Sequence, residues 1–106
     1  MVAESRPQEI AARLAAGEAI TLLDVREGWE VEHSAIEGIL HIPMGEVVAR
    51  REEIPGDRPL VCVCHHGMRS AQVAAYLEQQ GWAEVENLSG GIDAWSQTVD
   101  PSIPRY

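Results

Sequence analysis

A cysteine in the middle of the chain has the setting of a reactive thiol. Cys64 ends an apolar run, and a loop from His65 to Ser70 leads from it into a segment rich in helix-forming alanines. In open parallel α/β sheets, ligands bind beyond the carboxyl ends of the strands, where such loops lead into helix N-termini. The helix dipole and inward-pointing loop amides stabilise an anion there and favour the thiolate form of a cysteine. We therefore expect Cys64 to act as a nucleophile.

Two more residues of this loop suit a site for an anion. Gly67 accepts backbone dihedrals that let the loop amides curl around one centre. Arg69 carries a permanent charge and paired donors that match an oxyanion. The alternative is a buried core cysteine, which is the usual state of a free one. A strand end, a glycine loop and an arginine together favour the reactive thiol over that alternative.

The elements that position this loop alternate along the chain. Short apolar runs predict strands over residues 20–25, 39–42, 60–64 and 85–88, and helical patterns predict helices over residues 7–16, 28–33, 45–53, 70–80 and 91–98. This alternation predicts an α/β fold with a small, mainly parallel β-sheet flanked by helices on both faces. The length predicts one domain over residues 1–106, with an extended C-terminal tail from about residue 100 to 106.

The net charge of the chain disfavours some classes of binding partner. The formal net charge is −9, from 17 acidic residues against 8 arginines, and there is no lysine. This acidity disfavours nucleic-acid and membrane binding, and the apolar runs are too short to span a bilayer. The N-terminus shows no secretory signal, and two cysteines do not make a disulfide framework. We expect a protein of the reducing cytosol, in which thiols stay available.

Four motifs in order resemble the single-domain rhodaneses, a family of sulfurtransferases. The stretch Cys64-His65-His66-Gly67-Met68-Arg69-Ser70 is similar to the family's active loop, C-x-x-G-x-R-S. The other three are Leu23-Asp24-Val25-Arg26-Glu27, similar to D-V-R; Gly38 with His41-Ile42-Pro43, similar to G-x-x-x-I-P; and Gly90-Gly91-Ile92-Asp93-Ala94-Trp95, similar to G-G-x-x-x-W. One departure is Ser34-Ala35-Ile36-Glu37-Gly38, where relatives usually have G-H-I-P-G. That departure leaves the active loop intact.

The resemblance implies a rhodanese-like fold and a mechanism. In the family, the cysteine takes a sulfane sulfur from a donor such as thiosulfate, becomes a persulfide and passes the sulfur to cyanide or a thiol. Cys64 would then be the persulfide carrier in a ping-pong scheme, and the loop amides from His65 to Ser70 would cradle the outer sulfur. No cofactor is implied beyond this covalent intermediate. The implied partners are small sulfur donors and acceptors or a protein persulfide.

Two other functions remain alternatives to this interpretation. A binding or regulatory module that kept the fold and lost turnover is one, but inactive relatives commonly lose the cysteine that this chain keeps. Phosphatases with this fold are the other. They use C-x5-R, whereas here Arg69 follows Cys64 after four residues and Ser70 stands where the arginine would be needed. The spacing of four residues between Cys64 and Arg69 favours sulfur transfer over phosphate hydrolysis.

The residues beside the nucleophile allow two interpretations each. His65 and His66 either donate to the substrate, changing charge near their usual pKa, or face solvent, and we expect donation from at most one of them. Asp24 and Arg26 either orient the active loop or form an ordinary ion pair at a strand end. Structural support is the favoured role for this pair.

The second cysteine raises the question of a thiol pair or a metal site. Cys62 alternates onto the same side of the strand as Cys64, so a resolving thiol and a core residue are both conceivable; a disulfide at this spacing is strained, which favours the core. Together with His65 and His66 these cysteines are metal-ligand types. Four ligands packed into five positions do not easily converge, and structural zinc sites draw on two separated pairs. We expect no metal.

Overall fold

A five-stranded parallel sheet forms the centre of the molecule. The structure is a computed structural model that describes residues 2–106. Its strands are β1 (Ala3–Ser5), β2 (Thr21–Asp24), β3 (Leu40–His41), β4 (Leu60–Val63) and β5 (Val85–Leu88), in the spatial order β1-β5-β4-β2-β3. Every neighbouring pair runs parallel. The predicted α/β fold with a mainly parallel sheet is confirmed.

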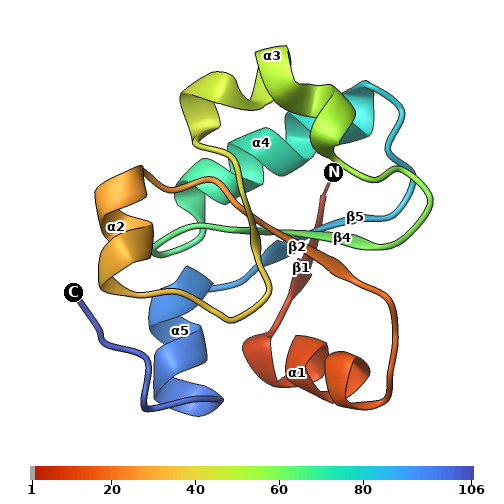
Figure 1. Cartoon of the computed structure of the whole chain (residues 1–106). Coiled ribbons are helices and arrows are strands. Elements are labelled where there is room, and N and C mark those ends of the chain that lie inside the picture. The colour runs from red at the N-terminus through yellow and green to blue at the C-terminus, as the bar shows by residue number, and fades with distance from the viewer. Residues whose placement is uncertain (1) are drawn as a thin grey trace.

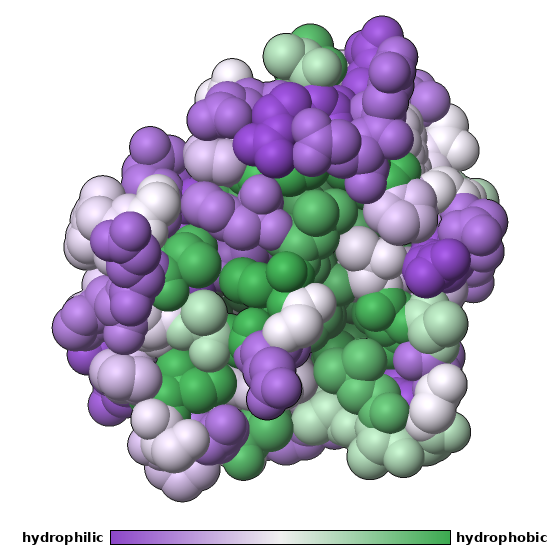
Figure 2. All heavy atoms as spheres, in the orientation of Figure 1, coloured by the Kyte–Doolittle hydropathy of each residue, from purple (hydrophilic) through white to green (hydrophobic). Residues whose placement is uncertain are grey.

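Helices cover both faces of this sheet. They are α1 (Pro7–Ala15), α2 (Gly28–His33), α3 (Val47–Arg50), α4 (Met68–Gln79) and α5 (Gly91–Thr98). Helices α3 and α4 lie on one side of the sheet and α1 and α5 on the other (Figure 1). On the face shown in Figure 2, apolar side chains gather between these two layers, and hydrophilic side chains surround them. No helix of residues 2–106 has the length and apolar composition that a membrane crossing requires.

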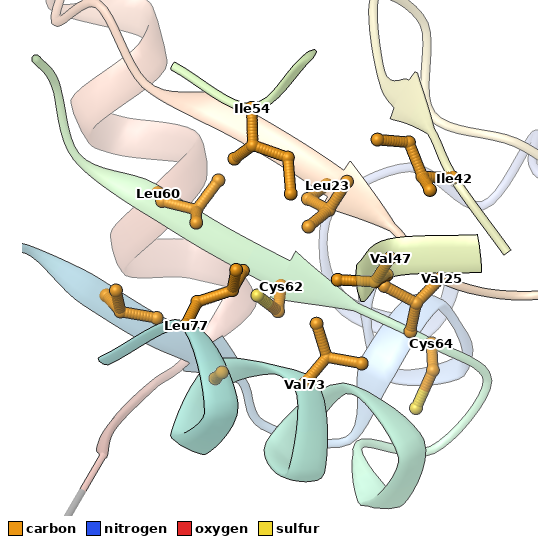
Figure 3. Close-up of a cluster of buried hydrophobic side chains, with 12 residues drawn as sticks. Leu23, Val25, Ile42, Val47, Ile54, Leu60, Cys62, Cys64, Val73 and Leu77 are labelled. Atoms are coloured by element: carbon orange, nitrogen blue, oxygen red, sulfur yellow. The ribbon is translucent and has the colours of Figure 1, made fainter. Parts of the chain in front are cut away.

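The central strand β4 is buried on both faces. Leu60 and Cys62 point into the cluster beneath α3 and α4, and Val61 and Val63 point into the cluster over α1 and α5. Figure 3 shows the first of these clusters, with Cys62 and Cys64 on the same side of the strand. A strand buried on both faces reads as an unbroken apolar run, which is why this strand was the clearest in the sequence. The carboxyl end of this strand leads directly into Cys64 and the predicted active loop.

Two elements differ from the sequence prediction. Strand β1 was not expected; it is three residues long, pairs only with β5 at the sheet edge, and has two exposed residues, so it carries no apolar pattern. The helix expected over residues 45–53 is divided into a 3-10 helix, the single turn α3 and a second 3-10 helix. Val47 and Ile54 anchor this segment on the core, and the residues between them are exposed or half-exposed. Packing therefore does not hold it in one regular helix.

The C-terminal tail returns from α5 toward the carboxyl ends of the strands. The Ser96 hydroxyl donates to the carbonyl of Ile103 at 2.6 Å, and the Ile103 side chain is buried. Arg105 pairs with Asp93 of α5 at 2.9 Å. The chain turns at residues 101–102 before it extends to the end, which lies beside α2 and α5 (Figure 1). These contacts bring Tyr106 over the active loop.

Candidate active site

The sulfur of Cys64 lies between the end of β4 and the start of α4. Cys64 is 1% exposed, and its sulfur points toward the first turn of α4 (Figure 3). The backbone N–H of Gly67 donates to Sγ at 3.1 Å. Gly67 has a φ of 104°, and a β-carbon there would lie 3.4 Å from the Gly90 nitrogen and the Leu88 carbonyl oxygen. The left-handed backbone that directs this amide at the sulfur thus favours glycine.

A pocket opens above this sulfur. Its volume is about 380 Å³, and it is lined by Cys64, His65, His66, Met68, Arg69 and Gln72. Gly67 and Ser70, the remaining members of the predicted loop, contact the sulfur itself. The structure therefore gathers all seven residues of the predicted active loop around one centre. Gln72, one turn further along α4, was not predicted.

Helix α5 supports the loop through its first turn. The backbone N–H of Ile92 donates to the Cys64 carbonyl at 2.8 Å, and that of Asp93 donates to the His65 carbonyl at 3.1 Å. A β-carbon at Gly91 would lie 2.4 Å from both of those carbonyl oxygens, and Gly91 has a φ of 61°. Only glycine allows so close an approach. The second glycine of the Gly90-Gly91 motif is thus required by the contact between α5 and the active loop.

Ser70 connects the sulfur to a buried asparagine that the sequence prediction missed. The Ser70 hydroxyl lies 3.2 Å from Sγ of Cys64 and 2.6 Å from Oδ1 of Asn87. The Asn87 amide nitrogen donates to the Glu4 carboxylate and to the Gly67 carbonyl at 3.0 Å. Both neighbours are acceptors, which fixes the orientation of the amide. A polar residue inside the strand 85–88 was the available signal.

The Ser70 hydroxyl is shared between Cys64 and Asn87, and the direction of its hydrogen bonds depends on whether the Cys64 thiol is protonated. Serine has one proton to donate, and its shorter contact, to Asn87, takes that proton. The Ser70 oxygen then accepts from the Cys64 thiol when the thiol is protonated. When the thiolate forms, a rotation of the hydroxyl lets Ser70 donate to the sulfur, joining the Gly67 amide. Ser70 therefore suits both protonation states of Cys64.

Arg69 is paired with a carboxylate of α2. Its guanidinium makes two parallel bonds to Glu30, from Nη1 to Oε1 at 2.7 Å and from Nη2 to Oε2 at 2.9 Å. The hydrogen bonds from Arg69 hold the pKa of Glu30 at about 2, and the Glu27 N–H adds to this effect. Burial acts in the opposite direction, but these hydrogen bonds outweigh it, so the buried Glu30 is charged at neutral pH. This pairing reduces the field that Arg69 offers to an anion in the pocket.

Asp24 and Arg26 hold α2 against the end of β2. Arg26 is fully buried, and its guanidinium bonds the Asp24 carboxylate at 2.6 Å and the Ser34 carbonyl at 2.7 Å. It also reaches the Glu30 carbonyl at 3.4 Å. The contacts described for the pair include none to Cys64. These contacts suit the structural support favoured from the sequence, and that role stays a prediction.

Tyr106 covers this network from the C-terminal tail. Its hydroxyl donates to Oε2 of Glu30 at 2.7 Å and accepts from Arg26 at 3.0 Å. Its ring stacks on that of His65, and Trp29 contacts it edge-on with centroids 5.9 Å apart. Burial raises the pKa of Tyr106 to about 12, so the hydroxyl keeps its proton. From the sequence, this region is predicted only as an extended tail.

The two histidines lie differently in the pocket wall. His65 is half-buried between the rings of His66 and Tyr106, and its Nε2 is buried without a hydrogen-bond partner among the described residues. Burial, helped by the nearby His66, lowers the pKa of His65 below its usual value. His66 is exposed, with Nε2 3.9 Å from an Asp93 oxygen. Of the two, His65 has the unused polar atom.

The fit of a metal ion to these side chains is poor. His65, His66 and Asp93 offer ligand atoms within 4.8 Å of one another, but Cys62 and Cys64 are not part of the group. The two imidazole rings contact each other, with centroids 3.8 Å apart and planes tilted by 30°. Asp93 already binds Arg105 and Gln97. The expectation that the protein holds no metal stays a prediction.

Cys62 lies deeper than Cys64. It is fully buried in the cluster beneath α4. Burial, with a smaller effect from Cys64, raises its pKa to about 12. A thiol with such a pKa is a poor nucleophile at neutral pH, because the thiolate is the reactive form. The surroundings of Cys62 support the interpretation as a core residue.

Comparisons with known proteins agree with this geometry. The sequence model of the rhodanese-like domain family matches residues 6–98. A sulfurtransferase of Allochromatium vinosum is 42% identical over 103 residues, covering 97% of this chain and 96% of that protein. The thiosulfate sulfurtransferase GlpE of Shewanella oneidensis is 33% identical over 79 residues, covering 74% of this chain and 78% of that protein.

A solved structure extends the similarity to the whole fold. A rhodanese-like domain protein from Staphylococcus aureus superposes with a TM-score of 0.86 at 26% identity, covering 99% of both chains. The cysteine loop at the end of a parallel strand and these similarities define a sulfurtransferase-type domain. The chain belongs to the rhodanese-like domain family, as its four motifs predicted.

Proposed function

We propose that this protein transfers a sulfane sulfur from a donor to a thiophilic acceptor through a persulfide on Cys64. The observation that carries the proposal is the place of the Cys64 sulfur. It lies at the base of a pocket, at the end of a buried strand, and accepts the Gly67 amide of the loop that starts α4. Membership in a family with sulfurtransferase relatives supports the same chemistry.

The first half-reaction loads the cysteine. With thiosulfate as donor, the Cys64 thiolate attacks the outer, sulfane sulfur and forms a new S–S bond. The S–S bond of thiosulfate breaks, and sulfite leaves with the electron pair. The negative charge now lies on the outer sulfur of the Cys64 persulfide, where loop amides stabilise it. No redox cofactor is needed.

The second half-reaction discharges the persulfide. A cyanide ion or a thiolate attacks the outer sulfur, and Cys64 leaves as the thiolate from which the cycle began. Small sulfur compounds and a protein persulfide are both proposed partners. A reducing compartment such as the cytosol suits this cycle, because Cys64 must return as a free thiol. Cys62 and Cys64 are free cysteines in the structure.

Mass spectrometry after treatment with thiosulfate tests the proposal. We expect one added sulfur atom on the wild-type protein and on Cys62→Ser, and none on Cys64→Ser. The Cys62 variant is the matched control, because it removes the other thiol of the same strand and cluster. An adduct that survives Cys64→Ser, or no adduct on any form with any sulfane donor, contradicts the proposal. The second result would favour a binding module with the same fold.

A further inference from the structure

A second hollow continues from the catalytic pocket along α4. It has a volume of about 240 Å³ and is lined by Met44, Val47, Val48, Gln72, Val73 and Tyr76. Gln72 lines both hollows. Met68, Gln72 and Tyr76 follow at four-residue spacing, so they form one stripe on the surface of α4. This stripe leads from the catalytic pocket into the second hollow, which we call the apolar groove.

Two exposed apolar side chains lie in the walls of the two hollows. Met68 in the pocket wall is 78% exposed, and Val48 in the groove wall is 60% exposed. With Trp29 they are the exposed large hydrophobic residues of the described chain. Apolar surface that gathers at one place on a soluble domain commonly marks a binding site. Two of the three exposed large hydrophobic residues thus lie beside the proposed site of sulfur transfer.

The charges at the pocket do not favour a small anion. Arg69 is the one arginine among the pocket residues, and both ends of its guanidinium bind Glu30. The chain contains no lysine. An inorganic anion therefore meets loop amides and histidines but no unpaired guanidinium. An uncharged organic chain needs no unpaired positive charge, and burial of its apolar surface in the groove favours its binding.

We infer that the apolar groove binds the carbon chain of a small organic thiol, which is the sulfur acceptor and, as its persulfide, the donor. This inference rests on the proposed function of Cys64. Gln72 lies one helical turn, about 6 Å, beyond Met68, so a chain whose sulfur reaches Cys64 crosses the pocket before it enters the groove. At about 30 Å³ for each water-sized group, the groove holds roughly eight such groups. That size suits a short chain.

The transfer step is balanced without a further reactant. The thiolate R–S⁻ attacks the outer sulfur of the Cys64 persulfide, and an S–S bond forms between them. The S–S bond to Cys64 breaks, and its electron pair leaves on the Cys64 thiolate. The product is the persulfide anion R–S–S⁻, so the two negative charges of the reactants are kept. The reverse reaction loads Cys64 from an organic persulfide, with R–S⁻ as the leaving group.

A series of n-alkanethiols tests the inference on the full chain. The protein is loaded with thiosulfate, the excess is removed, and ethanethiol, butanethiol or hexanethiol is added at equal, subsaturating concentrations. Mass spectrometry follows the loss of the added sulfur from Cys64. We expect the second-order rate constant to rise about two- to fourfold per methylene. The thiol group is the same throughout the series, so chain length is the variable.

Two neighbouring variants separate the groove from general effects. Val48→Ser removes an exposed apolar side chain from the groove wall, and Ala49→Ser changes the next, also exposed, residue that does not line it. We expect Val48→Ser to flatten the dependence on chain length and Ala49→Ser to keep it. Discharge by 2-mercaptoethanol, whose chain ends in a hydroxyl, should be the same in all three proteins.

Three results would overturn the inference, and each is distinct from failure of the proposed function. The first is equal rate constants for all alkanethiols, and the second is an unchanged chain-length dependence in Val48→Ser. The third is a flat alkanethiol series while Val48→Ser slows discharge to a thiol-bearing protein, which assigns the groove to a protein side chain. Failure of Cys64 to load with thiosulfate or any other sulfane donor instead contradicts the proposed function itself.

Discussion

The ring of Tyr106 stacks on the imidazole of His65, with centroids 3.9 Å apart and planes 5° from parallel. The same tyrosine bonds Glu30, the carboxylate that holds Arg69. One side chain from the C-terminal tail therefore contacts the active loop directly at its second residue and indirectly at its sixth. The tail thus supports residues that line the pocket.

Removing the Tyr106 hydroxyl should weaken this support. Tyr106→Phe keeps the stack on His65 but loses the bonds to Glu30 and Arg26, and we expect a loss of about 1–3 kcal/mol in the free energy of unfolding. Tyr76→Phe is the matched control, since the bond described for its hydroxyl is an exposed contact with Arg51. Urea unfolding measures both variants. Equal stability of the two would show that the Tyr106 hydroxyl bonds contribute little.

Neutralising Glu30 should change the preference for the sulfur donor. Glu30→Gln leaves the Arg69 guanidinium without its countercharge beside the pocket, so we expect the rate of Cys64 loading by thiosulfate to rise several-fold at low ionic strength. The gain should shrink as salt is added. Glu32→Gln, an exposed change on the same helix, is the control. Loading that falls or stays unchanged in Glu30→Gln contradicts the view that this pairing weakens anion binding.

Glu30 should also contribute to stability in a defined pH range. Its pKa in the folded protein is about 2, below the usual value of 4.5, so the unfolded chain binds the proton first as the pH falls. The stabilising contribution is complete above about pH 4.5 and is lost as the pH falls toward 2. Unfolding of wild type and Glu30→Gln across this range measures it. A stability difference that does not shrink on acidification contradicts the assignment.

A methyl group at Gly91 should separate α5 from the active loop. In Gly91→Ala the new β-carbon would lie 2.4 Å from two carbonyl oxygens of the loop, at a φ of 61°. We expect a loss of about 3 kcal/mol or more and slower loading of Cys64. Gly17→Ala is the control, because Gly17 has a φ of 88° and no atom within 4 Å of the added carbon. It should cost only the strain of a left-handed alanine, about 1–2 kcal/mol. Similar losses in both variants would contradict a role for close packing.

The arrangement of the predicted active loop around the Cys64 sulfur could be expected from the sequence because its contacts are local. Cys64, Gly67 and Ser70 lie within seven consecutive residues, and the strand before them and the helix after them have strong patterns of their own. The Gly67 amide, at the N-cap of α4, reaches the sulfur over three residues, a distance that local backbone geometry sets. The parallel sheet was predictable for a similar reason, since strands buried on both faces show as continuous apolar runs.

The partners of that loop were not predictable, because each comes from a distant part of the chain. Arg69 meets Glu30 across 39 residues, Ser70 meets Asn87 across 17, and Tyr106 meets Glu30 across 76. No periodicity in sequence encodes such pairs. Strand β1, too short and too polar to show a pattern, supplies Glu4 to the same network and was missed for that reason.

The sequence by itself determined the cysteine proposed as nucleophile, the loop that follows it and the kind of sheet that presents them, since these follow from residue types over short spans. Only the tertiary structure decided that the Arg69 charge is matched by Glu30, that Tyr106 packs on His65 and that an apolar groove adjoins the pocket. Those features depend on where the sheet order brings α2, α4 and the tail together. The position of Cys64 at a strand end follows from its neighbours in the chain, whereas the residues around its loop are brought there by the fold.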